Sequence, residues 1–428
     1  MREGALANKR DFTGSGDEPS TRPFWVDGLG RSLPQLHTVS NNTTAPFPSV
    51  TGGRLPFMDH LRWGVVVLVV TLHSAVTYSG IGGWYYHEPA NLDTTSLLTF
   101  LTYELHLQAF FMGLLFFVAG FFVPGAYDRK GAGQFLKDRM LRLGVPTVFY
   151  AMVIEPAIFY TVLFHKGSPV PPFWETYTRY LFTLQVLSGT GPLWFTFALL
   201  IFTAFYTGAR LWRGSAVWKP AVNRLPSHTE VTGFIAVIAL VTFLVRIVQP
   251  IGTDVINMQL CFFPQYIGLF VVGMVAYRGD WLLRIPRAFG LFWLRLAVIV
   301  GPVLWVGILL SGRVWSGDFS LIVGGVRWQS GLYCLWESLF CTGVCLGLVV
   351  IVRDAFNRHT ALTRFLSANC FAVYVFHAPI LIGLTVALHG LAWSPLAKFL
   401  LLSVAGLIVS LLASHFVLRR IPGLRRIL

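Results

Sequence analysis

Residues 62–73 read RWGVVVLVVTLH: a cation, ten residues without an ionisable group, and then an imidazole. A run this apolar is typical of a segment in lipid, where ionisable side chains are costly and rare. On an α-helix, eleven residues make about three turns and a rise of about 16 Å, so Arg62 and His73 share one face. The helix therefore presents a cation at the water boundary and a titratable base near the bilayer midplane.

The whole chain has the composition of an integral membrane protein. Its 428 residues are 55% hydrophobic and only 12% charged, with a positive mean hydropathy, a profile that soluble domains do not show. The net charge of +14 comes from cations scattered between apolar blocks, which argues against nucleic-acid binding. The five cysteines lie in or beside apolar segments without metal-ligand spacing, so we expect neither a disulfide framework nor a bound metal.

Ten apolar segments are long enough to cross a hydrocarbon core of about 30 Å. They cover approximately 62–80, 99–122, 143–164, 192–211, 231–249, 262–278, 289–310, 331–352, 366–388 and 396–417. Twenty of the 33 Lys and Arg residues fall in alternate links and in the C-terminal tail, and this bias places both termini in the cytoplasm. We predict an all-α polytopic membrane protein with about ten transmembrane helices in the cytoplasmic membrane.

The two ends of the chain are polar. Residues 1–56 are rich in Gly, Ser, Pro and Asn without periodicity, which predicts a disordered cytoplasmic tail. The transmembrane domain is predicted over 57–418, and 419–428 form a basic cytoplasmic tail. Trp84, Tyr85 and Tyr86 follow the first segment on the opposite side and fit an interfacial aromatic belt.

Other ionisable residues also fall inside apolar segments. His377 lies about eleven residues into its segment, which enters from the same side, so it reaches a depth similar to that of His73. Glu155 lies at comparable depth, and Arg246 and Glu337 suggest an internal ion pair. The structural alternatives are packed core histidines and polar groups that hold helices together, with Arg62 as a snorkelling residue.

A basic segment follows the second apolar segment. Arg139 and Arg142 are three residues apart in a helical pattern, with Lys137 close by, and guanidinium pairs hold phosphate by bidentate hydrogen bonds. Ordinary cytoplasmic positive charge is the alternative explanation. Asp59 precedes the first apolar segment, and capping of that helix is its expected role.

Four stretches resemble the membrane-bound acyltransferase-3 family, in family order. They are FMDHLRWGVVVLVVTLH (57–73), FFMGLLFFVAGFFVPGAYDRKGAGQFLKDRMLRLGVP (110–146), GPLWFTFALLIF (191–202) and FLSANCFAVYVFHAPIL (365–381). The elements Arg62 to His73 and Arg139 to Arg142 match the two signature motifs of the family. The most similar branch contains the succinyltransferases of osmoregulated periplasmic glucans. Gly120 matches a family glycine, whereas the preceding residue lacks the usual hydroxyl.

The resemblance implies an enzyme that moves an acyl group from cytoplasmic acyl-CoA to a hydroxyl of a cell-envelope carbohydrate. It implies that Arg62, Arg139 and Arg142 are essential, with their side chains at the CoA phosphates, and that His73 is essential too. His377 matches a histidine that is often found near the end of the domain.

Chemistry suggests roles for these residues. A near-neutral imidazole suits removal of a proton from a hydroxyl, so His73 is the expected base, and a covalent acyl carrier is the alternative. Tyr374, or His377 if protonated, is a candidate donor to the oxyanion.

Two other classes of function fit the same composition. A transporter or flippase for a glycan or lipid-linked sugar would line its conduit with the histidines and carboxylates. A lipid-binding scaffold would use the basic cytoplasmic face alone. The sequence leaves the acyl chain, the acceptor and the oligomeric state open.

Overall fold

A computed structural model describes residues 55–88, 92–167, 169, 171–214 and 224–425. These residues belong to one compact unit, Pro48–Leu428. The tail predicted over 1–56 lies outside the described residues apart from its last two, and so do residues 426–428 of the basic C-terminal segment.

The described residues form helices and connecting loops, with no strand among them beyond an isolated bridge between Val255 and Met258. The α-helices are α1 (Pro56–Ser79), α2 (Thr94–Arg139), α3 (Val145–Phe149), α4 (Glu155–His165), α5 (Phe173–Phe182), α6 (Trp194–Trp212), α7 (His228–Val248), α8 (Phe263–Arg278), α9 (Trp281–Arg284), α10 (Arg287–Ser311), α11 (Trp328–Ala355), α12 (Ala361–Leu388), α13 (Pro395–Phe416) and α14 (Pro422–Arg425). Short 3₁₀ turns lie at Gln185–Leu187, Gly191–Leu193, Leu260–Phe262, Val314–Ser316 and Leu418–Arg420.

Nine helices in the described part of the chain are long and apolar enough to cross a membrane. They contain all ten predicted apolar segments to within one residue, because Thr94–His165 is a single helical run that holds two of them. This result confirms the all-α polytopic membrane fold.

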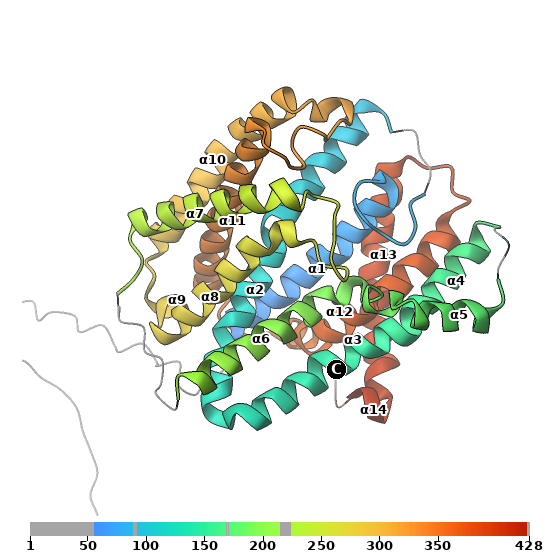
Figure 1. The fold of residues 1–428 in the computed structure, drawn as a ribbon, viewed down its shortest axis with the longest axis horizontal. Helices are drawn as coiled ribbons and strands as arrows, with labels where there is room; N and C mark the ends of the chain where they lie inside the picture. The colour runs from blue at the N-terminus through green and yellow to red at the C-terminus, as the bar shows by residue number, and fades with distance from the viewer. Residues whose placement is uncertain (1–54, 89–91, 168, 170, 215–223, 426–428) are drawn as a thin grey trace, which may run out of the picture. The chain divides into compact units, whose positions relative to one another are not determined.

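The long run Thr94–His165 reverses its direction at Gly131 (Figure 1). Gly131 has φ 71° and ψ 169°, a backbone conformation that glycine adopts without steric cost and other residues avoid. The two predicted membrane segments therefore lie on either side of one glycine, with the basic residues just after the reversal.

Two π-helical turns, Met140–Gly144 and Tyr150–Ile154, interrupt the second half of this run. Each ends two residues before a proline, Pro146 or Pro156. Proline has no N–H, and its ring clashes with the carbonyl four residues earlier, so a wider turn relieves the conflict without ending the helix.

Helix α5 supplies hydrogen-bond donors to backbone carbonyls that Pro156 leaves without a helical partner. The Met152 carbonyl lies four residues before Pro156 and lacks its helical donor, and it accepts a hydrogen bond from Tyr177 at 3.1 Å. The adjacent Ala151 carbonyl accepts from Tyr180 at 2.8 Å. Two phenols of α5 thus satisfy backbone groups that lack a helical donor before the proline.

Ion pairs mark the two ends of the helix bundle. At one end, Asp128 pairs with Arg210 of α6 at 3.0 Å and with Arg278 of α8 at 2.6 Å. At the other end, Glu88 after α1 pairs with Lys398 of α13 at 2.5 Å. The ends of α6 and α8 therefore meet the link within the run Thr94–His165 at one end of the bundle.

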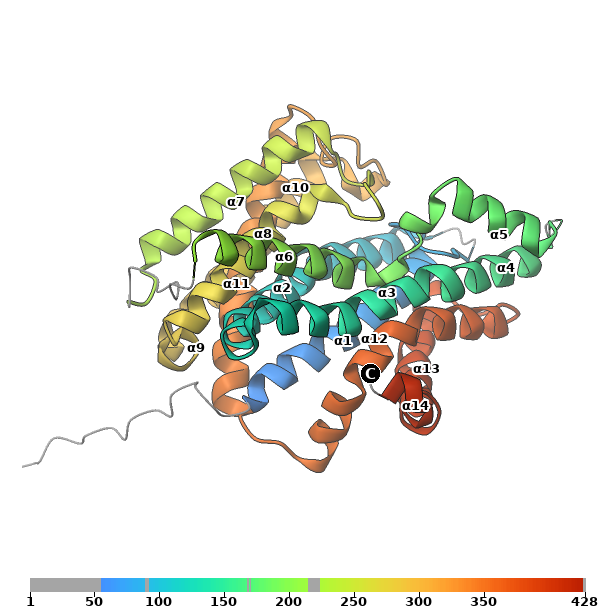
Figure 2. The ribbon, with the colours of Figure 1, turned by 60° about the horizontal axis from the view of Figure 1, so that its bottom comes forward.

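Helix α1 lies between α2 on one side and α12 and α13 on the other (Figures 1 and 2). Helices α2 and α8 approach with their backbones almost in contact. A Cβ atom on Gly120 would lie 2.2 Å from the Phe270 carbonyl oxygen, and one on Gly273 would lie 2.2 Å from that of Phe117. Small residues permit such close packing in membranes, which explains the need for glycine at position 120.

A buried ion pair joins α7 and α11. Arg246 Nη2 lies 2.7 Å from Glu337 Oε2, and both side chains are almost fully inaccessible. The guanidinium carbon of Arg246 also lies 5.1 Å from the ring centroids of Phe262 and Tyr333. The predicted internal pair is confirmed, and the five cysteines are all buried and unbridged.

Candidate active site

His73 of α1 and His377 of α12 meet in the interior of the bundle. Nδ1 of His73 lies 2.9 Å from Nε2 of His377, the ring planes differ by 3°, and the centroids are 5.1 Å apart. Because the centroid separation nearly equals the N···N distance plus two ring radii, the rings lie edge to edge, which favours a straight hydrogen bond. The similar depth inferred from the sequence thus brings the two imidazoles into contact.

The hydrogen bonds determine the tautomers of both rings. Nδ1 of His377 lies 2.8 Å from the Tyr374 carbonyl oxygen, which only accepts, so this nitrogen carries the proton and Nε2 is an acceptor. His73 then donates from Nδ1, and its Nε2 keeps a free lone pair. His377 is fully buried whereas His73 is half-buried, so His73 is the more accessible of the two histidines.

The loop after α1 folds inward over this pair. The Trp84 indole stacks on the His73 ring with centroids 4.0 Å apart and planes at 13°. Tyr85 donates a hydrogen bond to Glu155, and Tyr86 is only 3% exposed. The rings of these three aromatic residues therefore pack against the core of the bundle, and their place in an interfacial belt stays a prediction.

Glu155 belongs to a network that holds this loop. The Tyr85 hydroxyl lies 2.5 Å from Glu155 Oε2 and 2.9 Å from the Tyr150 hydroxyl. Burial, together with Tyr150 and Glu155, raises the pKa of the Tyr85 phenol well above its usual value. The phenol therefore stays protonated and donates to the carboxyl group, which links Glu155 to the loop that carries Trp84.

Tyr374 contacts another of the four sequence stretches that carry the resemblance. Its hydroxyl donates to the backbone carbonyl of Pro192, within the stretch GPLWFTFALLIF, and its own carbonyl orients His377. Both polar groups of Tyr374 thus have backbone or histidine partners, which gives the residue a positioning role in this geometry.

Arg62 lies in the second turn of α1, and its Nη1 is 3.3 Å from Asp59 Oδ1. Asp59 Oδ2 also lies 3.5 Å from Nε2 of His359. The prediction that Asp59 caps the helix is wrong: α1 begins at Pro56, and its N-cap residue Leu55 makes no side-chain cap. Asp59 instead lies within the first turn, where its charge complements the helix dipole.

Arg139 ends α2, and Arg142 lies in the π-helical turn that follows. Arg142 and Arg62 both repel the charge of Arg139, so guanidinium groups from two separate helices act on one region. Arg139 is half-buried, with its guanidinium carbon 5.0 Å from the Phe135 ring centroid, whereas Lys137 is exposed. This region, the arginine cluster of Arg62, Arg139 and Arg142, suits a ligand with several negative charges.

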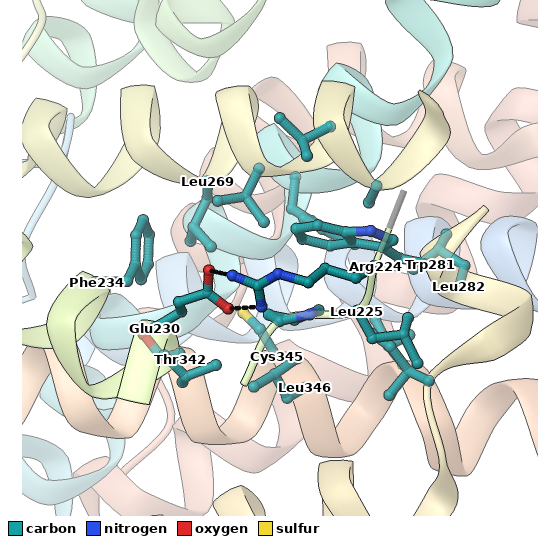
Figure 3. Close-up of a pocket in the computed structure, with 18 residues that line it drawn as sticks. Arg224, Leu225, Glu230, Phe234, Leu269, Trp281, Leu282, Thr342, Cys345 and Leu346 are labelled. Carbon is teal, nitrogen blue, oxygen red and sulfur yellow. Dashed lines mark hydrogen bonds and ion pairs between the residues drawn. The ribbon is translucent and has the colours of Figure 1, made fainter. Parts of the chain in front are cut away.

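A separate cavity of about 430 Å³ lies among α7, α8 and α11 (Figure 3). Its lining is almost wholly apolar, and its two charged residues, Arg224 and Glu230, bind each other through hydrogen bonds of 2.6 and 2.7 Å. None of the site residues inferred from the sequence lines this cavity. Its only carboxylate, Glu230, is occupied by Arg224, and the cavity contains no histidine.

Sequence reasoning missed the contact between Trp84 and His73. The signal that points to it is SGIGGWYY, residues 79–86, in which three glycines precede three aromatic residues. Glycines allow a loop to turn back on its helix, and aromatic side chains that return in this way bury a large apolar area.

No curated protein and no solved structure matches the chain. A family model described as an acyltransferase domain, acyltransferase-3, matches residues 55–415. The matched region includes both histidines, the Trp84 loop and the arginine cluster. The chain therefore belongs to the acyltransferase-3 family and is a membrane acyltransferase.

Proposed function

We propose that the protein transfers an acetyl or succinyl group from cytoplasmic acyl-CoA to a hydroxyl of a cell-envelope carbohydrate, with His73 as the general base. The observation that carries this proposal is the hydrogen bond between His73 and His377, which leaves one nitrogen of a half-buried imidazole without a partner among the described residues. Family membership supports acyl transfer as such, and the resemblance of the motifs to the glucan succinyltransferase branch motivates the donor and the acceptor.

The arginine cluster supports CoA as the carrier. Arg62 and His73 lie on one helix, about 16 Å apart along its axis. Phosphates bound by Arg62, Arg139 and Arg142 would leave the pantetheine arm to extend along α1, so that the thioester reaches the imidazole. Guanidinium groups suit phosphate because they hold it by paired hydrogen bonds.

The opposite end of the bundle supports a polar acceptor. The Tyr86 hydroxyl lies 3.4 Å from His165 Nε2 and 3.5 Å from His389 Nδ1. The ion pair of Glu88 and Lys398 lies at the same end. A hydroxyl-rich molecule that enters here finds hydrogen-bonding groups on its way to His73.

The reaction follows from the free lone pair of His73. Nε2 takes the proton of the acceptor hydroxyl as its oxygen attacks the thioester carbonyl carbon, and the carbonyl π electrons move to the oxygen. When the tetrahedral intermediate collapses, the C–S bond breaks. The departing CoA thiolate takes the proton from His73, which regenerates the neutral imidazole and leaves an ester and free CoA.

The test is acceptor-dependent release of CoA. The full chain is reconstituted in liposomes with acetyl-CoA or succinyl-CoA and candidate envelope glycans, and the free thiol and the acylated glycan are both measured. We expect His73→Ala to lower the turnover number by at least about 10²-fold. The control is His415→Ala, which removes an exposed imidazole at the end of α13 and is expected to leave the rate unchanged.

Three outcomes would count against the proposal. His73→Ala with wild-type turnover would exclude His73 as the base. Movement of a glycan across the liposome membrane without CoA release would favour a transporter. An acyl group trapped on His73 after reaction with acyl-CoA alone, and chased into product by acceptor, would replace the general base with a covalent carrier.

A further inference from the structure

The indole N–H of Trp84 is a buried hydrogen-bond donor without a partner among the described residues. Other indole N–H groups of the chain share this property, Trp293 among them, but Trp84 is the one whose ring stacks on His73. An unpaired donor in a site of low polarity costs free energy unless a ligand or water satisfies it. Its position beside the base indicates that the missing partner is a reactant.

The protein holds this indole in place from several directions. Gly80 and Gly82, with φ values of 69° and 93°, turn the chain back from the end of α1. After Trp84, the Tyr85 hydroxyl is bound to Glu155, and Glu88 is bound to Lys398 of α13. Both sides of Trp84 are therefore anchored, so its ring is set before a substrate arrives.

The ring geometry aligns a base and a donor in adjacent layers. The two imidazoles lie edge to edge in one plane, and the Trp84 ring lies over them, at 13° to His73 and 14° to His377. The lone pair of His73 Nε2 and the N–H of Trp84 both lie in the planes of their own rings. If the two groups point to the same edge of the stack, a tetrahedral carbon there can present its attacking oxygen to one layer and its carbonyl oxygen to the other.

We propose that the Trp84 N–H donates the hydrogen bond that stabilises the oxyanion formed from the thioester carbonyl. This inference depends on the proposed acyl transfer and adds a catalytic residue to it. The proton on Nε1 stays on Trp84 throughout, while the carbonyl oxygen gains negative charge during attack and loses it when the C–S bond breaks. Donors fixed before the reaction are effective because they need no reorganisation as the charge develops.

The experiment uses Trp84→Phe, which keeps an aromatic face on His73 and removes the donor. Loss of one oxyanion donor is expected to lower kcat by about 10²-fold or more, with the KM for acyl-CoA changed by less than about threefold. Trp84→His restores a ring N–H, and its kcat is expected to be at least tenfold higher than that of Trp84→Phe. Trp293→Phe removes an equally unpaired indole N–H from α10, far from His73 in the fold, and is expected to keep the wild-type rate.

A binding measurement separates catalysis from structure. A ketone analogue of acyl-CoA, in which a methylene group replaces the thioester sulfur, is expected to bind wild type and Trp84→Phe with the same affinity. The proposal is overturned if Trp84→Phe retains more than a third of the wild-type kcat. It is also overturned if Trp84→His is no faster than Trp84→Phe, or if analogue binding weakens as much as kcat falls.

A failure of this inference about Trp84 is distinct from a failure of the proposed function. The latter would appear as a wild-type protein that releases no CoA with any acceptor. If Trp84→Phe does not fold, Trp84→His decides alone, because a folded donor variant with less than a hundredth of wild-type kcat contradicts the proposal.

Discussion

Replacement of His377 tests whether this residue positions and supports His73. In the resting state, His73 donates a neutral hydrogen bond to His377 at 2.9 Å. When His73 takes a proton from the acceptor, the same bond becomes charge-assisted. Neutral bonds contribute about 0.5–1.5 kcal/mol and bonds to charged groups about 1.5–3 kcal/mol, so the bond strengthens by about 1 kcal/mol or slightly more. That difference corresponds to roughly a five- to tenfold effect on rate.

His377→Ala removes this gain and also frees the His73 ring to rotate or change tautomer. Misplacement of a reacting group by about 1 Å can cost about 10²-fold, so we expect the kcat of His377→Ala to fall by about 10²-fold. The KM for acyl-CoA should change little, because His377 is fully buried and lies away from the arginine cluster.

His377→Gln distinguishes a positioning role from simple packing. The amide oxygen of glutamine can accept from His73 Nδ1, so this variant should recover to within about tenfold of the wild-type rate. The assay is CoA release under saturating substrates, with His415→Gln as the control. A kcat for His377→Ala above a third of the wild-type value, or equal rates for the alanine and glutamine variants, would refute the reasoning.

Three further outcomes follow from other contacts. Arg139→Gln and Arg142→Gln should each raise the KM for acyl-CoA about tenfold. The lysine variants should recover part of this loss, because lysine binds phosphate as a point charge. An unchanged KM in steady-state kinetics would remove these residues from the donor site. Glu337→Leu leaves Arg246 as a buried charge without its carboxylate and should lower the free energy of unfolding by about 3–5 kcal/mol, which a lower thermal midpoint would show. The double variant with Arg246→Met should restore the midpoint, and no recovery in the double variant would contradict this. Gly120→Ala places a Cβ atom 2.2 Å from a backbone oxygen of α8 and should destabilise the fold by about 1–3 kcal/mol, whereas Gly133→Ala, which meets nothing within 4 Å, should not; equal midpoints would refute the close-packing argument.

The membrane helices and the meeting of the two histidines follow from simple features of the sequence. Apolar runs of about 20 residues predict the spans because the bilayer thickness selects their length. His73 and His377 each lie about eleven residues into a segment that enters from the same side, and helical rise alone places them at one depth. Sequence arithmetic does not reveal which edges of the rings face each other, because this depends on the rotation of α1 and α12 about their axes.

Features that depend on loops were harder to predict. The contact of Trp84 with His73 depends on the path of residues 80–88, and no periodicity encodes such a path. The sequence predicts two successive spans and hence a reversal between them, but not that helix continues on both sides of a single glycine, Gly131, because the residues on both sides favour helix. The misassigned role of Asp59 had a readable signal, since Pro56 is suited to the first turn of a helix and marks an earlier start.

The chain of hydrogen bonds from His73 through His377 ends at the Tyr374 carbonyl. A backbone carbonyl accepts a hydrogen bond but does not take up a proton, so the chain is a dead end for proton conduction. A proton that arrives at His73 must leave by the same nitrogen, onto the departing thiolate. In the proposed acyl transfer the hydroxyl proton ends on the CoA thiol, and no proton is taken from or released to either aqueous phase, so the rate should be the same whether or not the membrane carries a proton gradient.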